Sequence, residues 1–245
     1  MLLLRAGHPE DPALDLAVSH ALLRRVGAGD LGALARVCHP GPTMAFGRLD
    51  ALRDGYGAAR DAARAHGYTP VLRLGGGHAA GYDEGSVLVE IITPQASIAG
   101  GIEERFRDVT ALIVEALEAT GAQPGVGELP GEYCPGRWSV HLGGRVKVAG
   151  TAQRSIRGAS LVAAAVVVEG GARLRAALVD VYAALALDWD PSTAGAAEDL
   201  APGLRAPEVA DAVVAALARR GPLTEAALDA ETLDLARELR DRHAL

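Results

Sequence analysis

Residues 132–154 bring together side chains that can carry out nucleophilic chemistry. The stretch reads Glu-Tyr-Cys-Pro-Gly-Arg-Trp-Ser-Val-His-Leu-Gly-Gly-Arg-Val-Lys-Val-Ala-Gly-Thr-Ala-Gln-Arg. Cys134 stands in a Pro/Gly turn, and Lys147 follows on the second strand of an expected hairpin. A cysteine thiolate can attack an electrophilic carbon, and a nearby ammonium group can activate the thiol or donate a proton. The stretch therefore predicts a nucleophile at Cys134 and an acid or activating cation at Lys147; a buried structural thiol and a solvated lysine are the alternatives.

Lys147 is the only lysine in the sequence, because every other basic side chain apart from the seven histidines is arginine. Arginine can supply a positive charge equally well, but a guanidinium does not release its proton near neutral pH. A lysine kept at this one position therefore indicates a role in proton transfer.

The expected hairpin sets a geometric condition on this pair. Around the Gly143-Gly144 turn, Lys147 is expected to face Val140, and Cys134 lies about six residues farther along, on the order of 20 Å on a straight strand. The Pro135-Gly136 corner must fold Cys134 back toward Lys147 for the two side chains to act together.

A second segment, residues 73–85, is rich in glycine and lies between two expected strands. Glycines let backbone N–H groups approach an anion or a carbonyl closely, and Arg73 adds a fork of donors. The glycine spacing and the strand that follows exclude a dinucleotide-binding fingerprint, and no Gly-Lys-Ser/Thr follows to make a phosphate-binding P-loop. The segment predicts either a backbone cradle built by Gly75, Gly76 and Gly77 or a glycine hairpin without a ligand. His78 is either an incidental loop residue or a base beside the pocket.

Composition limits the kinds of protein that the chain can be. Its 245 residues suffice for one large α/β domain or two small ones. A net charge of −7 argues against nucleic acid as a partner, because phosphate contacts need a basic surface. Cys38 and Cys134, the only cysteines, lie far apart, which predicts no disulfide scaffold, no metal site and a reducing, cytoplasmic setting.

The sequence also predicts no membrane association. Charged residues from Arg5 onward interrupt the apolar start too early for a signal peptide. The longest apolar run, Leu161 to Val168, has about half the length of a membrane-spanning helix.

Hydrophobic periodicity predicts helices and strands in mixed order. Helices are expected over 12–26, 57–66, 102–120, 173–187, 207–220 and 224–243. Strands are expected over 31–37, 43–46, 68–74, 86–92, 137–142, 145–149 and 159–168. This order predicts an α/β (α+β) fold with a mixed β-sheet packed against helices. We expect a catalytic domain over 1–205 and a short helical extension over 206–245 that packs on it.

The two segments together resemble the catalytic domain of the biotin/lipoate protein ligase family. Its glycine segment, Arg-x-x-Gly-Gly-x-Ala…Asp-x-Gly-x-Leu, is matched by Arg73, Gly76, Gly77, Ala79, Asp83, Gly85 and Leu88 after a shift of one. Its second segment, Gly-x-Lys-x-x-Gly-x-x-Gln-Arg, is matched by Gly144, Lys147, Gly150, Gln153 and Arg154, with one extra residue before the lysine. The resemblance implies a fold similar to class II aminoacyl-tRNA synthetases and biotin protein ligases.

Tyr-Cys-Pro-Gly ahead of the hairpin is most similar to the octanoyl/lipoyl amidotransferases of this family. The resemblance implies catalysis by Cys134 and Lys147, with an octanoyl or lipoyl group passing through a Cys134 thioester to a carrier lysine. It further implies substrate contacts from Arg73, Gly75, Gly76, Gly77, His78, Ala79, Gly150, Thr151 and Ala152. His78 and Leu88-Val89-Glu90 depart from the family pattern, so a relative with a different acyl group is also consistent with the sequence.

Two other functions remain open at this point. One is an ATP-dependent lipoate–protein ligase, which would need ATP and Mg and would leave Cys134 incidental. The other is a protein that binds lipoyl domains or an acyl ligand without catalysis. The transferase needs no cofactor, and its expected partners are lipoyl carrier domains, of the H-protein or dehydrogenase-complex type, and an acyl carrier protein as a further candidate.

Overall fold

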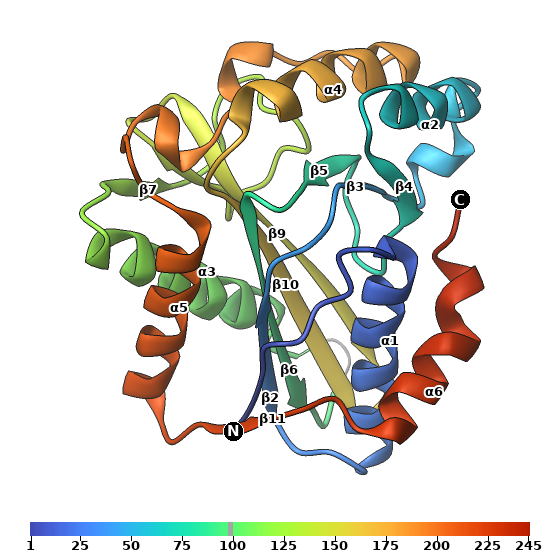
Figure 1. Ribbon diagram of the computed structural model, residues 1–245, viewed down its shortest axis with the longest axis vertical. Helices are drawn as coiled ribbons and strands as arrows, with labels where there is room; N and C mark the ends of the chain where they lie inside the picture. The colour runs from blue at the N-terminus through green and yellow to red at the C-terminus, as the bar shows by residue number, and fades with distance from the viewer. Residues whose placement is uncertain (98–99) are drawn as a thin grey trace.

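The computed structural model describes residues 1–97 and 100–245, which form two β-sheets covered by helices (Figure 1). The helices are α1 (Pro12–Ala28), α2 (Tyr56–Ala65), α3 (Ile102–Ala119), α4 (Gly171–Ala184), α5 (Ala206–Arg220) and α6 (Ala230–Leu239). The strands are β1 (Leu2–Leu4), β2 (Leu34–Cys38), β3 (Thr43–Phe46), β4 (Thr69–Leu72), β5 (Ala80–Tyr82), β6 (Ser86–Pro94), β7 (Pro124–Val126), β8 (Val140–Leu142), β9 (Val146–Ile156), β10 (Ala159–Val167) and β11 (Thr224–Ala226). The predicted α/β (α+β) class, with a mixed sheet packed against helices, is confirmed.

The larger sheet has eight strands in the order β11-β1-β2-β6-β10-β9-β8-β7. Its β11, β1 and β2 run parallel, and the remaining neighbours pair antiparallel. The smaller sheet has the order β4-β3-β5. β10 lies at the centre of the larger sheet and is almost entirely apolar, as expected of a strand covered on both faces.

Helices cover both faces of the larger sheet (Figure 1). On one face, α3 and α5 pack on the strands through a core that includes Val109, Ile113 and Val213. The helix expected over 102–120 is thus confirmed as α3, with its apolar stripe facing the sheet. On the other face, α1 and α6 pack together over a second core that includes Leu22 and Ala236.

The smaller sheet and the helices α2 and α4 form a layer above the α1 face (Figure 1). Their common core includes Phe46, Tyr68, Leu178 and Tyr182. This layer closes one end of the larger sheet, and the glycine-rich segment connects β4 to β5 there. The candidate site lies where the two sheets meet.

The strands on either side of the Cys38–Pro42 turn belong to different sheets, because β2 joins the larger sheet and β3 the smaller one. Two expectations about the elements are corrected. The glycine segment is interrupted by β5, which pairs with β3. The helix expected over 224–243 is shorter, because Thr224–Ala226 pairs in parallel with β1, and α6 begins only after Asp229, whose carboxylate caps it by accepting from Thr232 N.

Among the described residues, none of the helices combines the length and the apolar composition that crossing a bilayer requires.

Candidate active site

A cavity of about 120 Å³ opens between the α1 face of the larger sheet, the glycine segment and the turn that carries Cys134. Small residues on neighbouring strands form its floor: Ala165 of β10 pairs with Gly150 of β9, and Ala163 pairs with Ala152. Such small side chains leave space above the sheet that larger ones would fill. The lining is mostly apolar, with polar groups at its two ends.

Lys147 lies at one end of this cavity and is 2% exposed. Its Nζ donates to Glu132 Oε1 at 3.1 Å, to the carbonyl of Tyr133 at 3.0 Å and to the carbonyl of Cys134 at 2.8 Å. An ammonium group has three protons and no acceptor site. In this arrangement each of the three protons of an ammonium group has a partner, which fixes the position of Nζ.

Glu132 is the buried counter-charge of Lys147 and also organises the turn before Cys134. Its carboxylate accepts from Ser139 Oγ at 2.6 Å, from Gly136 N at 3.0 Å and from Leu129 N at 3.1 Å. A buried carboxylate needs such partners, because an unpaired charge is costly inside a protein. Glu132 thereby fixes the corner that brings Cys134 to Lys147.

Cys134 has a left-handed backbone conformation, with φ of +41°. Such a conformation is strained for a residue with a side chain, and it persists only when the surroundings hold it. Here the amide of Cys134 donates to the Tyr182 hydroxyl at 2.8 Å, and that hydroxyl donates to the carbonyl of Ala79 at 2.9 Å. Burial raises the pKa of Tyr182, so the phenol stays protonated and can serve as this link.

The thiol of Cys134 has a guanidinium as its neighbour. Arg73 Nη2 lies 3.4 Å from Sγ and also donates to the carbonyl of His78 at 2.7 Å. A cation beside a cysteine sulfur stabilises the thiolate. The sequence assigned this activating role to Lys147, whereas the structure places Arg73 at the sulfur and Lys147 at the carbonyls of the turn.

The geometric condition that the expected hairpin placed on Cys134 and Lys147 is met, but the register of the hairpin differs from the expected one. The Pro135-Gly136 corner does fold Cys134 back, since Lys147 Nζ reaches the Cys134 carbonyl. Lys147 pairs with His141 and not with Val140, because the loop between the strands has three residues, Gly143, Gly144 and Arg145, so that Leu142 pairs with Val146. A bulge beyond this pair places Val140 opposite Ala149.

The other residues that the sequence predicts to contact substrate lie in two places. Arg73, Gly75, Gly150, Thr151 and Ala152 line the cavity. Gly76, Gly77, His78 and Ala79 lie outside its lining, on the part of the glycine segment that passes Cys134. There Gly77 has a φ of +92°, and a Cβ on it would lie 2.7 Å from Cys134 Sγ.

His78 is paired with a buried carboxylate. Its Nδ1 lies 2.7 Å from Asp50 Oδ1, and Oδ2 of the same carboxylate accepts from Gly47 N at 2.9 Å. Asp50 is fully buried, while the imidazole of His78 is 26% exposed. Asp83 accepts from the Tyr68 hydroxyl and contacts Arg173.

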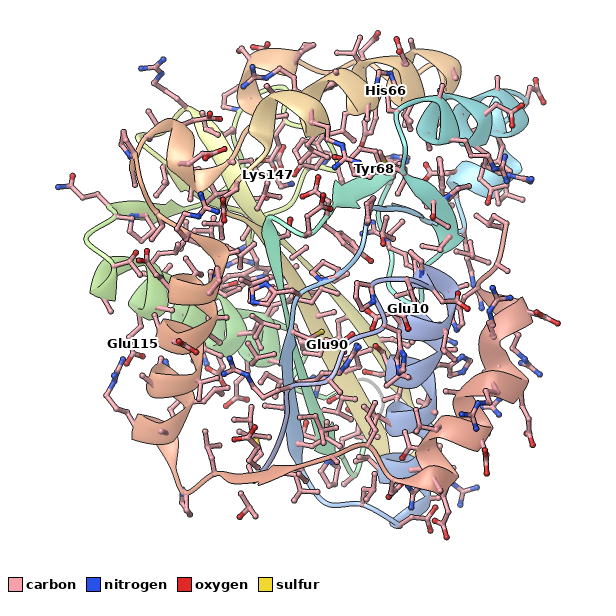
Figure 2. The ribbon with its side chains drawn as sticks, in the orientation of Figure 1. Glu10, His66, Tyr68, Glu90, Glu115 and Lys147 are labelled. Atoms are coloured by element: carbon pink, nitrogen blue, oxygen red, sulfur yellow. The ribbon has the colours of Figure 1, made fainter. Side chains whose placement is uncertain are left out.

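The far end of the cavity is also polar. Asp15, Ser19 and Glu90 line it, and the fully buried Arg36 donates to both carboxylates. Ser19 Oγ donates to Glu90 Oε2 at 2.9 Å. Figure 2 shows Glu90 well away from Lys147 along the sheet, so the apolar part of the cavity lies between two polar ends.

Three contributors to the site had weak or no signals in the sequence. Tyr182 is 48 residues from Cys134, and nothing local connects them. Asp50 sits in a short 3-10 helix (Asp50–Leu52) that shows no motif. Glu132 is the first residue of the 132–154 stretch, 15 residues before the only lysine of the sequence, and an acidic residue within that stretch is the signal that could have identified it.

No group of three or more His, Cys, Asp or Glu side chains in residues 1–97 and 100–245 is arranged to hold a metal ion.

Comparison with known proteins agrees with this architecture. The model of the lipoyl protein ligase A/B catalytic domain matches residues 11–217. An octanoyl-[GcvH]:protein N-octanoyltransferase of Geobacillus kaustophilus is 32% identical over 69% of this chain and 59% of its own length. The same-named protein of Bacillus velezensis is 30% identical over 78% of this chain and 67% of its own length. The chain thus spans less than two thirds of the first of these relatives.

Solved structures show the same fold at lower sequence identity. A lipoate-protein ligase A bound with ATP superposes with a TM-score of 0.77 at 21% identity, over 98% of this chain and 94% of the other. A bipartite lipoate protein ligase of Thermoplasma acidophilum gives a TM-score of 0.75 at 20% identity, over 98% and 92%. With the family model matching most of its length, the chain belongs to the lipoyl protein ligase A/B catalytic domain family.

Proposed function

We propose that this chain is an acyltransferase of protein lipoylation that carries an octanoyl or lipoyl group as a thioester on Cys134. The observation that carries the proposal is the setting of the thiol: a strained backbone holds Cys134 at the mouth of an apolar cavity, with Arg73 at its sulfur. A structural cysteine needs neither the strain nor the cation. The two named relatives are octanoyltransferases, which favours the same reaction.

The proposed reaction has two steps. First, the Cys134 thiolate attacks the acyl carbonyl of a donor; a C–S bond forms, the bond to the donor's nitrogen or sulfur breaks, and the leaving group takes a proton. Second, the ε-amine of an acceptor lysine attacks the thioester; a C–N bond forms, the C–S bond breaks, and the amine loses a proton. The acyl group ends as an amide on the acceptor, and Cys134 is regenerated.

The apolar cavity, Lys147 and Arg73 each have a role in these steps. The apolar cavity holds the acyl chain, and each buried methylene contributes about 0.8 kcal/mol to binding. Lys147 binds the acyl carbonyl oxygen when one of its N–H groups moves from the Cys134 carbonyl to the developing oxyanion. Arg73 stabilises the thiolate, and the glycine segment, including Gly77, carries the backbone past the sulfur.

The partners follow from the reaction. Acceptors are lipoyl carrier domains, of the H-protein or dehydrogenase-complex type, and the donor is such a carrier or an acyl carrier protein. The name of the relatives includes GcvH, and one structural neighbour was described together with its E2 lipoyl domain. The transferase requires no cofactor, and we propose that it works in the cytoplasm.

An ATP-dependent lipoate ligase is the second candidate, because the fold is shared with a ligase that binds ATP. In that case the glycine segment and Lys147 would hold an acyl-adenylate, and Cys134 would be incidental.

Transfer assays separate the two functions. The purified chain is incubated with an octanoylated H-protein-type carrier or octanoyl acyl carrier protein and an acceptor lipoyl domain, with and without ATP, Mg and free lipoate. We expect transfer without ATP and its loss in Cys134→Ser. Transfer that requires ATP and persists in Cys134→Ser would overturn the transferase and establish the ligase.

A further inference from the structure

The second step of the proposed reaction needs a proton acceptor that Lys147 does not provide. A lysine ε-amine is protonated near neutral pH and must lose a proton to attack the thioester. Lys147 Nζ lies against the Glu132 carboxylate and two carbonyl oxygens at 2.8–3.1 Å. All of these groups are acceptors, so the three protons of the ammonium group are all used in hydrogen bonds. An ammonium nitrogen has no lone pair left to receive another proton.

His78 meets the requirements for such a proton acceptor. The Asp50 carboxylate only accepts hydrogen bonds when ionised, so the proton of a neutral His78 imidazole is on Nδ1. This leaves the lone pair on Nε2, which has no hydrogen-bond partner among the described residues. The buried Asp50 is itself fixed by Gly47 N, so the ring orientation is fixed as well.

The backbone of His78 is also close to the sulfur that carries the acyl group. The His78 carbonyl and Cys134 Sγ share one neighbour, Arg73 Nη2, at 2.7 and 3.4 Å. The preceding residue, Gly77, lies so close to the sulfur that a Cβ on it would be 2.7 Å from Sγ. The part of the segment that includes His78 lies outside the cavity lining, and the His78 imidazole is 26% exposed, so a carrier lysine can reach it from solvent.

We propose that His78, oriented by Asp50, is the general base that takes the proton from the acceptor lysine as it attacks the Cys134 thioester. The inference rests on the proposed function. The amine nitrogen forms the new C–N bond, its proton moves to Nε2, and the C–S bond breaks to release the Cys134 thiolate. With an amide donor, the same imidazolium returns the proton to the leaving amine in the first step.

The charged groups around the imidazole come from several elements. Asp50 belongs to the short helix after β3, Arg73 follows β4, and Cys134 comes from the turn before β8. Tyr56 of α2 lies near Asp50, and Arg60 of the same helix lies over the Tyr56 ring, 5.5 Å from its centroid. Of these groups, the Asp50 carboxylate is in direct contact with the His78 ring.

The test separates the two half-reactions. Cys134 is first loaded from octanoyl acyl carrier protein, a thioester donor that needs no protonated amine as leaving group. Transfer to the acceptor lipoyl domain is then followed in a single turnover between pH 6 and pH 9. For His78→Asn we expect normal loading and a transfer rate at pH 7 lowered on the order of 100-fold. The deficit should shrink as pH rises, because more acceptor amine is then already deprotonated.

Hydroxylamine provides a readout that a merely structural role would not give. It is unprotonated near neutral pH, so it should release the octanoyl group from His78→Asn as fast as from the unchanged protein. His66→Asn is the matched control, because His66 also contacts a carboxylate, Asp180 at 2.6 Å, but lies just after α2, away from the cavity (Figure 2). It should transfer at the normal rate.

Asp50→Asn tests the orientation of the ring. The amide oxygen can still accept from Gly47 N, while its NH₂ donates to Nδ1 and moves the imidazole proton to Nε2. We expect normal loading and slow transfer. Loading followed by normal transfer at pH 7 in His78→Asn would overturn the role of His78, and so would an equal loss of transfer to lysine and to hydroxylamine. Failure of the unchanged protein to load would instead contradict the proposed function.

Discussion

The atoms around Cys134 Sγ lie so close together that a carbon added at Gly77 would not fit between them. Gly77 has a left-handed backbone, and a Cβ on it would meet Arg73 Nη2 at 2.5 Å and Cys134 Sγ at 2.7 Å. Gly76, next to it, has open space around its Cβ position and an ordinary φ. A methyl group added at Gly77 would therefore clash with its neighbours, whereas one added at Gly76 would not.

We predict that Gly77→Ala lowers the rate of octanoyl transfer at least about tenfold and costs about 1–2 kcal/mol of unfolding free energy, because the strained backbone and the displaced sulfur act together. Gly76→Ala should retain most of the rate. Transfer assays and urea unfolding measure both quantities. Equal rates in the two variants would mean that the sulfur is not where the structure places it.

Lys147 and Glu132 form a buried ion pair, and a change to one partner should affect stability as well as activity. Lys147→Met leaves the Glu132 carboxylate buried with three neutral donors. We expect a loss of about 3 kcal/mol in unfolding free energy, partly restored by adding Glu132→Gln. Arg237→Met, which removes an exposed pair with Asp234, should cost less than about 1 kcal/mol. Urea unfolding of the four proteins tests this; a fully stable Lys147→Met would contradict the ion-pair account.

At the scale of elements, the central strands determine which acyl chain fits. Ala165 of β10 and Gly150 of β9 pair side by side on the cavity floor, so a larger side chain on β10 would enter the space assigned to the chain. We predict that Ala165→Leu raises the KM for an octanoyl donor at least about tenfold, because several methylenes lose about 0.8 kcal/mol each. A butanoyl donor, which fills less of the cavity, should be affected much less. Equal effects on both donors would mean that the chain lies elsewhere.

At the scale of the whole molecule, the end of the chain is bound to the strand that leads to the site. His243 Nδ1 donates to the Leu72 carbonyl at 2.7 Å, and Leu72 N donates back to the His243 carbonyl at 2.9 Å. His243 Nε2 lies 3.1 Å from Nδ1 of His20 on α1. The 206–245 segment therefore holds β4 in place, and Arg73 directly follows β4. The division of the chain after residue 205 remains a prediction, and the family match extends past it to residue 217.

This contact predicts a dependence of stability on pH. Burial and the neighbouring His243 lower the pKa of His20 from 6.5 to about 4, and burial lowers that of His243. Between pH 6.5 and 4 the unfolded chain binds more protons than the folded one, so stability is lost as pH falls through this range. We expect the melting temperature to fall from pH 7 to pH 4.5, and less steeply in His20→Gln. The same slope in His20→Gln would rule out this histidine as the cause.

The sequence supported some of these features better than others. Cys134, Lys147 and the amphipathic α3 follow from local patterns: residue type, spacing and helical periodicity. The pairing of β11 with β1 joins segments far apart in the sequence, and the three residues Thr224–Ala226 carry too little hydrophobic pattern to reveal it. Arg73 at the thiol depends on how the smaller sheet packs against the turn, so spacing alone assigned that role to Lys147. Asp50 beside His78 is equally a product of tertiary packing.

The intact mass of the protein after incubation with octanoyl acyl carrier protein, and separately with an octanoylated carrier domain, tests the central claim most directly. The account predicts the added mass of one octanoyl group, its removal by hydroxylamine, and its absence in Cys134→Ala. The same measurement identifies the donor, since only a competent donor loads the enzyme. The same octanoyl adduct on Cys134→Ala, or no adduct with either donor from a protein that still lipoylates an acceptor domain with ATP and lipoate, would contradict the thioester route.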